Sequence, residues 1–379
     1  MLQSLKERPS RFALPALLVI VVGAWFLRPP FSLTFALIFL VGSITAVLTN
    51  GRYAMRRIVG VIPVLFVVSF IVFALMASLP GDPAINILGP AATPDAVERV
   101  NEELGLDEPF FNRYGNWLGD AVVGDLGESI LLRAEVTDAV GTALTPTLQL
   151  MVYSLILAIL ISFPLGIYAA YRNGQVEDRT INTVMLGFFA VPPYVLAVVF
   201  VLFLALGGIG VFGLKILPAT SYVPLGESVT DHFKHMALPA FSLALGQSAI
   251  FMRLLRSDMI GTLRLPFIDL ARSKGLSTKR ILWMHALRPS MFTLVTVMGF
   301  TVGTLIGGAL ITEIIFVLPG LGTFMLTAIT QRDFISVQGG TMVIATFYIL
   351  ILVLVDFLYL ALDPRLRSGG GASLGGSDG

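Results

Sequence analysis

Residues 253–289 read RLLRSDMIGTLRLPFIDLARSKGLSTKRILWMHALRP, and this stretch decides how the rest of the chain is interpreted. It holds eight basic and two acidic residues, a balance of +6, and long apolar runs flank it on both sides. A basic segment between apolar runs is typical of a loop between membrane spans, and its positive charge favours the cytoplasmic side. The rest of the chain should therefore cross a membrane around this loop.

Helix signals divide the loop into two parts. Phe267 to Lys274 contains neither Gly nor Pro and predicts a short helix. Gly275 can close that helix because glycine accepts positive φ. Ser277 or Thr278 can cap a second helix that runs to Leu287. The sequence thus predicts a helix–turn–helix knob, which is either a solvated loop without a partner or a docking element.

Composition supports a membrane protein. The chain is 56% hydrophobic and 13% charged, with a mean hydropathy of +0.86. Soluble domains are usually about 25% charged. The absence of cysteine excludes disulfides and thiolate chemistry. No G-x-x-x-x-G-K-[ST] stretch or catalytic constellation occurs, so we expect the chain to be neither an ATPase nor another enzyme.

Hydropathy predicts eight spans in an all-α polytopic protein. They are Ala13–Leu27, Phe31–Leu48, Ile58–Leu79, Thr147–Tyr171, Ile181–Leu206, Met236–Met252, Thr293–Val317 and Gln338–Leu362. Pro192-Pro193 predicts a kink within the fifth span. With both termini in the cytoplasm, 18 basic residues fall inside and 7 outside, as the positive-inside rule favours.

The segment 80–146 has the opposite charge. It contains twelve acids and three Arg, a balance of −9, and the span alternation places it outside the cell. Thr93 and Pro94 predict a helix start, and Gly105 predicts its end. This segment should be a small helical external subdomain.

Several motifs resemble one known family. Asp269-Leu270-Ala271 precedes Gly275 at the spacing of the coupling ("EAA") loop of ABC-importer permeases of the dipeptide/oligopeptide/nickel family. The resemblance extends to Pro80-Gly81-Asp82-Pro83, and further matches occur at Leu276-Ser277, His285–Arg288, Gly124–Ser129, Thr312–Phe316, Pro319–Gly322 and Asp363–Arg367. Leu270 departs from the family's usual Ala, and Thr293 stands where Pro is usual.

The resemblance implies a six-span type I ABC-importer permease core with an extra N-terminal two-span hairpin. It assigns 1–57 to the hairpin and its basic linker, 58–367 to the permease core, and 368–379 to a disordered Gly/Ser-rich tail. Within the core, 80–146 is the external subdomain and 253–289 is the coupling loop. No role for the hairpin follows from the sequence.

The same resemblance implies the partners. A second, different permease completes the pathway, two cytoplasmic ATPase subunits hold ATP and Mg, and an external binding protein delivers di- or oligopeptides. The expected ATPase-coupling residues are Asp269, Leu270, Ala271, Arg272, Lys274, Gly275, Leu276, Lys279 and Arg280. Pro80, Gly81, Asp82 and Pro83 form an expected external docking or turn motif. This chain itself should carry no cofactor and no nucleic acid.

Two acids fall within predicted spans. Glu313 and Asp356 could form structural hydrogen bonds or line the substrate pathway, because ionisable groups in a bilayer are costly. Gly299, Gly303 and Gly307 repeat every four residues and fit either intramolecular packing or a permease–permease interface. The three His residues lie on both sides of the predicted membrane, so no metal site is expected.

Two other function classes stay open. A secondary transporter or channel would work without ATPases, but it would favour an internal repeat and several intramembrane charges. A membrane scaffold with an outer sensor domain would not need the coupling-loop spacing. The exact substrate and the partner subunits cannot be read from the sequence.

Overall fold

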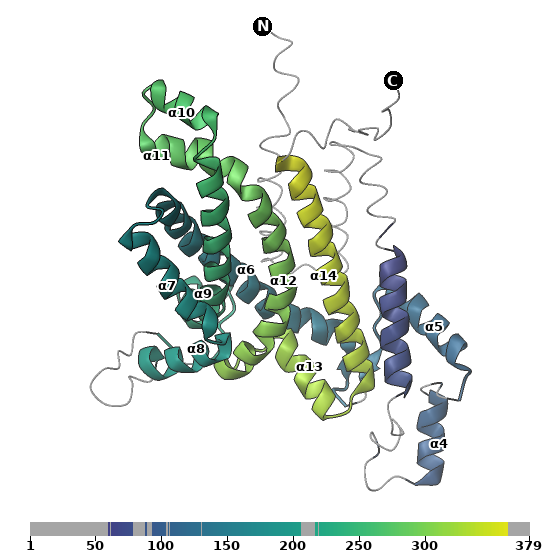
Figure 1. The fold of residues 1–379 in the computed structure, drawn as a ribbon. Helices are drawn as coiled ribbons and strands as arrows, with labels where there is room; N and C mark the ends of the chain where they lie inside the picture. Colours follow the sequence, from purple (N-terminus) through teal and green to yellow (C-terminus); the bar gives the residue numbers. More distant parts are fainter. Residues whose placement is uncertain are drawn as a thin grey trace, which may run out of the picture.

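The computed structural model describes residues 60, 62–78, 88, 93–103, 105, 107–129, 131–205, 217–218 and 220–362. At 103, 304, 350 and from 353 onward it describes the backbone alone. The predicted N-terminal hairpin, the Pro80–Pro83 motif and residues 363–379, which include the predicted tail, lie outside the described residues. Within these ranges the chain is helical apart from one two-stranded hairpin, which confirms the expected helical class (Figure 1).

The elements follow one another in a simple order. A helix at Ile62–Ser78 precedes α4 (Pro94–Glu103), α5 (Phe110–Val123), β1 (Glu128–Ser129), β2 (Ala134–Glu135), α6 (Val136–Tyr171), α7 (Val176–Ala190) and α8 (Pro193–Phe200). After a π-helical turn at Val201–Ala205 come α9 (Val229–Thr262), α10 (Pro266–Ser273), α11 (Thr278–Arg280), a second π-helical turn (Ile281–Ala286), α12 (Leu287–Phe316), α13 (Leu321–Thr330) and α14 (Phe334–Leu362). The two strands pair antiparallel, Glu128 with Glu135 and Ser129 with Ala134.

Three helices within the described residues are long and apolar enough to cross a membrane, or five if each of two bent pairs forms one span. The three are Val136–Tyr171, Val229–Thr262 and Thr278–Gly303. Ile62–Ser78 and Phe334–Ile349 are shorter apolar helices. Two of the eight expected spans lie outside the described residues.

The predicted kink at Pro192-Pro193 is a full break. α7 and the helix that follows it meet at 94°. Pro192 has extended backbone (φ −57°, ψ 142°), and Pro193 begins α8. A residue that precedes proline avoids helical geometry, so consecutive prolines end one helix and start the next.

The helix α13 was not predicted. The expected spans Thr293–Val317 and Gln338–Leu362 leave no helix between them. In the structure α12 ends at Phe316, and Val317 after it has a left-handed φ of 54°. The axis of α13 makes an angle of 82° with the last part of α12. The first turn of α13 is held by residues from other helices, a contact that sequence spacing does not reveal.

α6, α9 and α12 form the centre of the bundle. α6 and α9 approach closely at Gly166, where an added Cβ would lie 3.1 Å from the Met252 carbonyl oxygen. Buried apolar side chains form two clusters along these helices. One, which includes residues of α13, contains Leu150, Leu243 and Leu305, and the other, which includes residues of α10, contains Phe251, Leu255 and Ile268.

The helix Ile62–Ser78 packs on α5 through aromatic side chains. Phe70 and Phe73 meet Phe110 and Tyr114 edge to face, with ring centroids 5.3–5.8 Å apart. The Ser69 hydroxyl lies 2.8 Å from the Tyr114 hydroxyl. The expected helix at Pro94 is present as α4. These contacts make the segment a folded unit beside the bundle.

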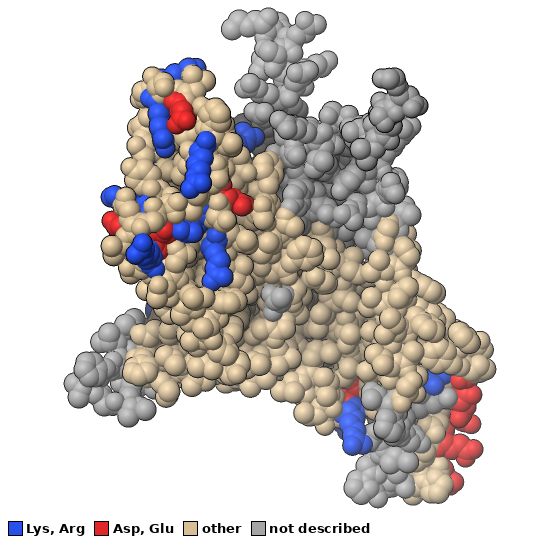
Figure 2. All heavy atoms as spheres, viewed as in Figure 1, with Lys and Arg blue, Asp and Glu red and all other residues tan. Residues whose placement is uncertain are grey.

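Charge divides the visible face of the bundle into two ends (Figure 2). Lys and Arg gather around α10, α11 and the neighbouring helix ends, whereas Asp and Glu gather over α4 and α5 at the opposite end. The surface between them carries few charges, as a lipid-facing belt should. The basic knob and the acidic subdomain thus lie at opposite ends.

Candidate functional site

The knob at the basic end is built as the local signals predict. α10 begins at Pro266 after extended backbone at Leu265 and ends at Ser273. Gly275 has φ +73°, its N–H donates to the Arg272 carbonyl at 2.9 Å, and the Leu276 N–H donates to the Ala271 carbonyl at 3.3 Å. An added Cβ at Gly275 would meet nothing within 4 Å, so the position needs glycine for its backbone angle and not for space.

α10 has two different faces. Ile268 and Ala271 are buried against the chain's own core. Phe267 and Leu270 are 43% and 57% exposed. Asp269 and Arg272 form an exposed ion pair at 3.5 Å, a kind of pair that contributes little stability. The small size of Ala271 therefore serves the packing of α10 on that core, while Leu270 faces away from it.

The second half of the knob continues directly into α12. α11 and the π-helical turn run from Thr278 to Ala286 without a break. Ser277 occupies the capping position, but its side chain makes no capping hydrogen bond. Lys274, Lys279 and Arg280 are exposed, whereas Ile281 is buried.

Exposed apolar side chains accompany these cations. Trp283 and Met284 are 43% and 65% exposed and lie on the same knob as Phe267 and Leu270. Apolar surface rimmed by charge at a solvent-facing end is typical of a protein interaction site. The sequence analysis named Leu270 among the expected coupling residues, but it did not name Phe267, Trp283 or Met284.

The knob is fastened to the bundle beneath it. Ile268 and Ala271 share one buried cluster with Leu255 and Met259 of α9. The hydroxyls of Thr262 and Ser290 lie 2.9 Å apart, joining the end of α9 to the start of α12. A displacement of the knob should therefore be passed on to both helices.

Glu313 lies at the other end of α12 and is fully buried. Its carboxylate accepts from the Thr147 hydroxyl at 2.6 Å and from the backbone N–H groups of Gly322 and Thr323 at 2.8 and 3.1 Å. The Thr147 hydroxyl oxygen accepts from the Leu321 N–H at 2.7 Å. Glu313 and Thr147 together cap the first turn of α13, an arrangement that fits the structural interpretation of this acid.

The second intramembrane acid, Asp356, lies on α14, but its side chain is outside the described residues.

The three glycines of the predicted row on α12 have different surroundings. Gly303 faces α14, because an added Cβ would lie 2.5 Å from the Tyr348 ring. Gly299 is buried, and an added Cβ at Gly307 would meet nothing within 4 Å. Gly303 thus serves packing within the chain, and Gly307 is open to a neighbour.

The Gly124–Ser129 motif connects the subdomain to the bundle. Gly124 and Gly127 have positive φ, as tight turns require. The Ser129 hydroxyl donates to the buried Asp333 carboxylate, which also accepts from the Ser336 hydroxyl at 2.6 Å. This bond joins residues 204 positions apart, so the sequence analysis missed it.

Comparison with known proteins identifies the family. A family model described as "binding-protein-dependent transport system inner membrane component" matches residues 162–368, and the model of its N-terminal part matches residues 50–134. This chain belongs to that family. The permease is therefore a multi-pass inner-membrane subunit of an ABC transporter, and it transports without being an enzyme. Transporters of this type work with ATPase and binding-protein partners.

Three relatives match nearly along their whole length. A Brucella abortus protein, provisionally named a peptide transport system permease, is 37% identical over 83% of this chain and 98% of its own. A dipeptide transport system permease of Alkalihalophilus pseudofirmus is 33% identical over 83% and 99%. A glutathione transport system permease of Escherichia coli is 32% identical over 83% and 99%.

The family is one of transport subunits without cofactors. Among the described residues, no group of three or more His, Cys, Asp or Glu could hold a metal ion. The His232 ring instead lies in a hydrogen-bonded network, 3.0 Å from the Tyr153 hydroxyl and 2.7 Å from the Val223 carbonyl.

Proposed function

We propose that this permease is one of two pathway-forming subunits of an importer for di- or oligopeptides. The observation that carries the proposal is its match to permeases named for peptide, dipeptide and glutathione transport over nearly their entire length. Peptides present a cationic amine, a carboxylate and a repeated amide. A binding protein that recognises these groups would deliver them to the outer end of the pathway.

The proposed topology places the knob in the cytoplasm. Lys and Arg concentrate at the α10–α11 end, and the acidic α4–α5 end would face outward (Figure 2). Both termini would then be cytoplasmic. The six-span core would begin at the helix Ile62–Ser78, preceded by the two-span hairpin, and α7 with α8 would count as one broken span.

The knob is the proposed docking site of the ATPase. Phe267 and Leu270 would enter an apolar groove on that subunit, while Arg272, Lys274, Lys279 and Arg280 would pair with acids at its rim. Asp269, Ala271, Gly275 and Leu276 would hold the knob in shape. Closure of the ATPases would push the knob, and the buried contacts of α10 would pass the displacement to α9 and α12.

The proposed assembly contains a second, different permease and two ATPase subunits. The open position at Gly307 leaves room for a neighbouring helix and is the part of the glycine row that supports the permease interface. The acidic subdomain, with the Pro80–Pro83 motif leading into it, would receive the binding protein. Asp356 remains the proposed pathway acid, and Glu313 acts on the pathway through α13.

Uptake by purified transporter in proteoliposomes tests the function. We expect a labelled dipeptide to accumulate when the binding protein is outside and ATP is inside, and to stop when a non-hydrolysable ATP analogue replaces ATP. A labelled free amino acid serves as the substrate control. Uptake driven by a proton gradient without ATP would instead identify a secondary transporter and overturn the proposal.

A further inference from the structure

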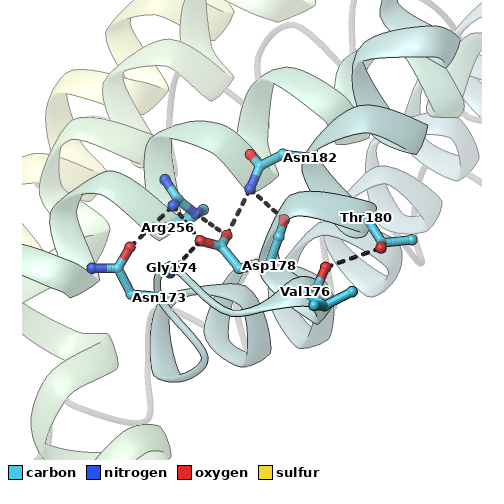
Figure 3. Close-up of polar contacts among 7 residues, drawn as sticks. All are labelled: Asn173, Gly174, Val176, Asp178, Thr180, Asn182 and Arg256. Carbon is cyan, nitrogen blue, oxygen red and sulfur yellow. Dashed lines mark hydrogen bonds and ion pairs between the residues drawn. The ribbon is translucent and has the colours of Figure 1, made fainter.

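Asp178 and Arg256 form a buried clamp between the start of α7 and the end of α9 (Figure 3). The Arg256 guanidinium donates from Nε to one carboxylate oxygen and from Nη2 to the other, at 2.5 and 2.7 Å. The Arg256 side chain is 23% exposed and the Asp178 side chain 4%. Two parallel hydrogen bonds between one guanidinium and one carboxylate fix the orientation of the two side chains as well as the distance between them.

The clamp also fixes the turn between α6 and α7. The Gly174 N–H donates to the Asp178 carboxylate at 2.9 Å, and the Asn182 amide donates to it at 2.7 Å. Arg256 reaches the Asn173 side-chain oxygen at 3.2 Å. The Asp178 carboxylate thus accepts hydrogen bonds from the turn, from the first part of α7 and from α9, as Figure 3 shows.

Apolar packing also holds α7, and the Arg253 guanidinium of α9 lies 6.0 Å from the centroid of the Phe189 ring. Met185 of α7 is buried in a small cluster with Ala249 and Met252 of α9. The Phe189 side chain is still 50% exposed. The clamp adds a charged, two-hydrogen-bond contact to this packing between α7 and α9.

α9 connects the clamp to the knob without interruption. Arg256 lies six residues before Thr262, the last residue of α9, a distance of about 9 Å along a helix. Between them Met259 packs in the cluster that seats Ile268 of α10. On its far side, α7 meets the next helix at the 94° break. A push on the knob can reach α7 and α8 through this route.

We propose that Asp178 and Arg256 are a positioning pair that makes α7 follow α9 when the knob is displaced, an inference that rests on the proposed coupling role of the knob. Without the clamp, the ATPases would still move the knob and α9, but α7 would lag. ATP would then be hydrolysed with less substrate moved. The diagnostic quantity is substrate transported per ATP, which does not depend on how much protein folds.

The test uses the complete transporter in proteoliposomes, with uptake and ATP hydrolysis measured on the same sample. We expect Asp178→Asn to lower transport per ATP about fivefold or more, the lower range of measured coupling effects. Arg256→Lys keeps the positive charge but loses the paired hydrogen bonds of the guanidinium. Its transport per ATP should therefore lie between that of wild type and that of Asp178→Asn. Arg179→Gln removes an exposed cation from the first part of α7, next to Asp178; it is the matched control and should keep the wild-type ratio.

A covalent rescue separates fastening from a general structural role. The chain has no cysteine, so Asp178→Cys with Arg256→Cys places its two thiols where the clamp was. We expect the double variant to transport less substrate per ATP than wild type. A bifunctional thiol reagent should bring that ratio back to within about twofold of the wild-type value once the cross-link has formed. If Asp178→Asn transports as much substrate per ATP as wild type, the proposed role of the clamp is wrong and the proposed function stands. The same holds if a complete cross-link does not restore transport per ATP in the double variant. Failure of wild type to couple ATP to uptake overturns the proposed function and the clamp together.

Discussion

The capping of α13 by Glu313 yields the most specific prediction. Glu313→Ala removes the acceptor of the Gly322 and Thr323 N–H groups, while Thr147 keeps the Leu321 N–H. A buried donor left without an acceptor costs about 1–3 kcal/mol. Two such donors should weaken the docked position of α13 by about 2–6 kcal/mol. Glu313→Gln keeps one oxygen and the side-chain shape, so its effect should be smaller.

A buried thiol on α13 measures this loss directly. Ala328 is 3% exposed and the chain lacks cysteine, so Ala328→Cys reports only when α13 leaves its site. Because 1.4 kcal/mol is a factor of ten, a loss of 2 kcal/mol should raise the labelling rate about 30-fold. Glu227→Ala, at an exposed carboxylate, is the matched control and should leave the rate unchanged. Equal labelling of Glu313→Ala and wild type would refute the capping argument.

Three further predictions concern packing and turns. Gly303→Ala should lower thermal stability by about 1–3 kcal/mol because its Cβ would lie 2.5 Å from the Tyr348 ring. Adding Tyr348→Ala should recover part of that loss, and no recovery in a melting experiment would contradict the contact. Ser129→Ala removes a donor to buried Asp333 and should speed proteolysis in the β1–β2 turn, whereas unchanged cleavage argues against the tie. Gly275→Val should destabilise the knob more than Gly275→Asn, because asparagine accepts φ +73° more readily; thermal melting ranks the two.

Local signals predicted the parts of the structure that depend on neighbouring residues. Gly275 closes α10 because the turn is decided by the residues on either side of it. The start of α4 at Pro94 and the break at Pro192-Pro193 follow from proline geometry in the same way. The angle of that break did not follow, because packing against other helices sets it.

Contacts between distant residues could not be predicted. α13 was missed because Thr147 and Glu313 supply its cap from two other helices. The clamp was missed because Asp178 and Arg256 are 78 residues apart. The exposure of single side chains could not be predicted either, since Ala271 and Leu270 are neighbours in sequence and yet differ in burial. Only the folded chain shows that the first is buried and the second is exposed.

The central claim is that the knob docks an ATPase, and co-purification tests it most directly. The tagged permease is purified in mild detergent as wild type, as Leu270→Glu on the knob and as Val122→Glu on α5 at the opposite end, both exposed positions. We predict that ATPase subunits and a second permease accompany wild type and Val122→Glu, and that only the ATPases are lost from Leu270→Glu. ATPases retained equally by all three, or absent from wild type, would contradict the account.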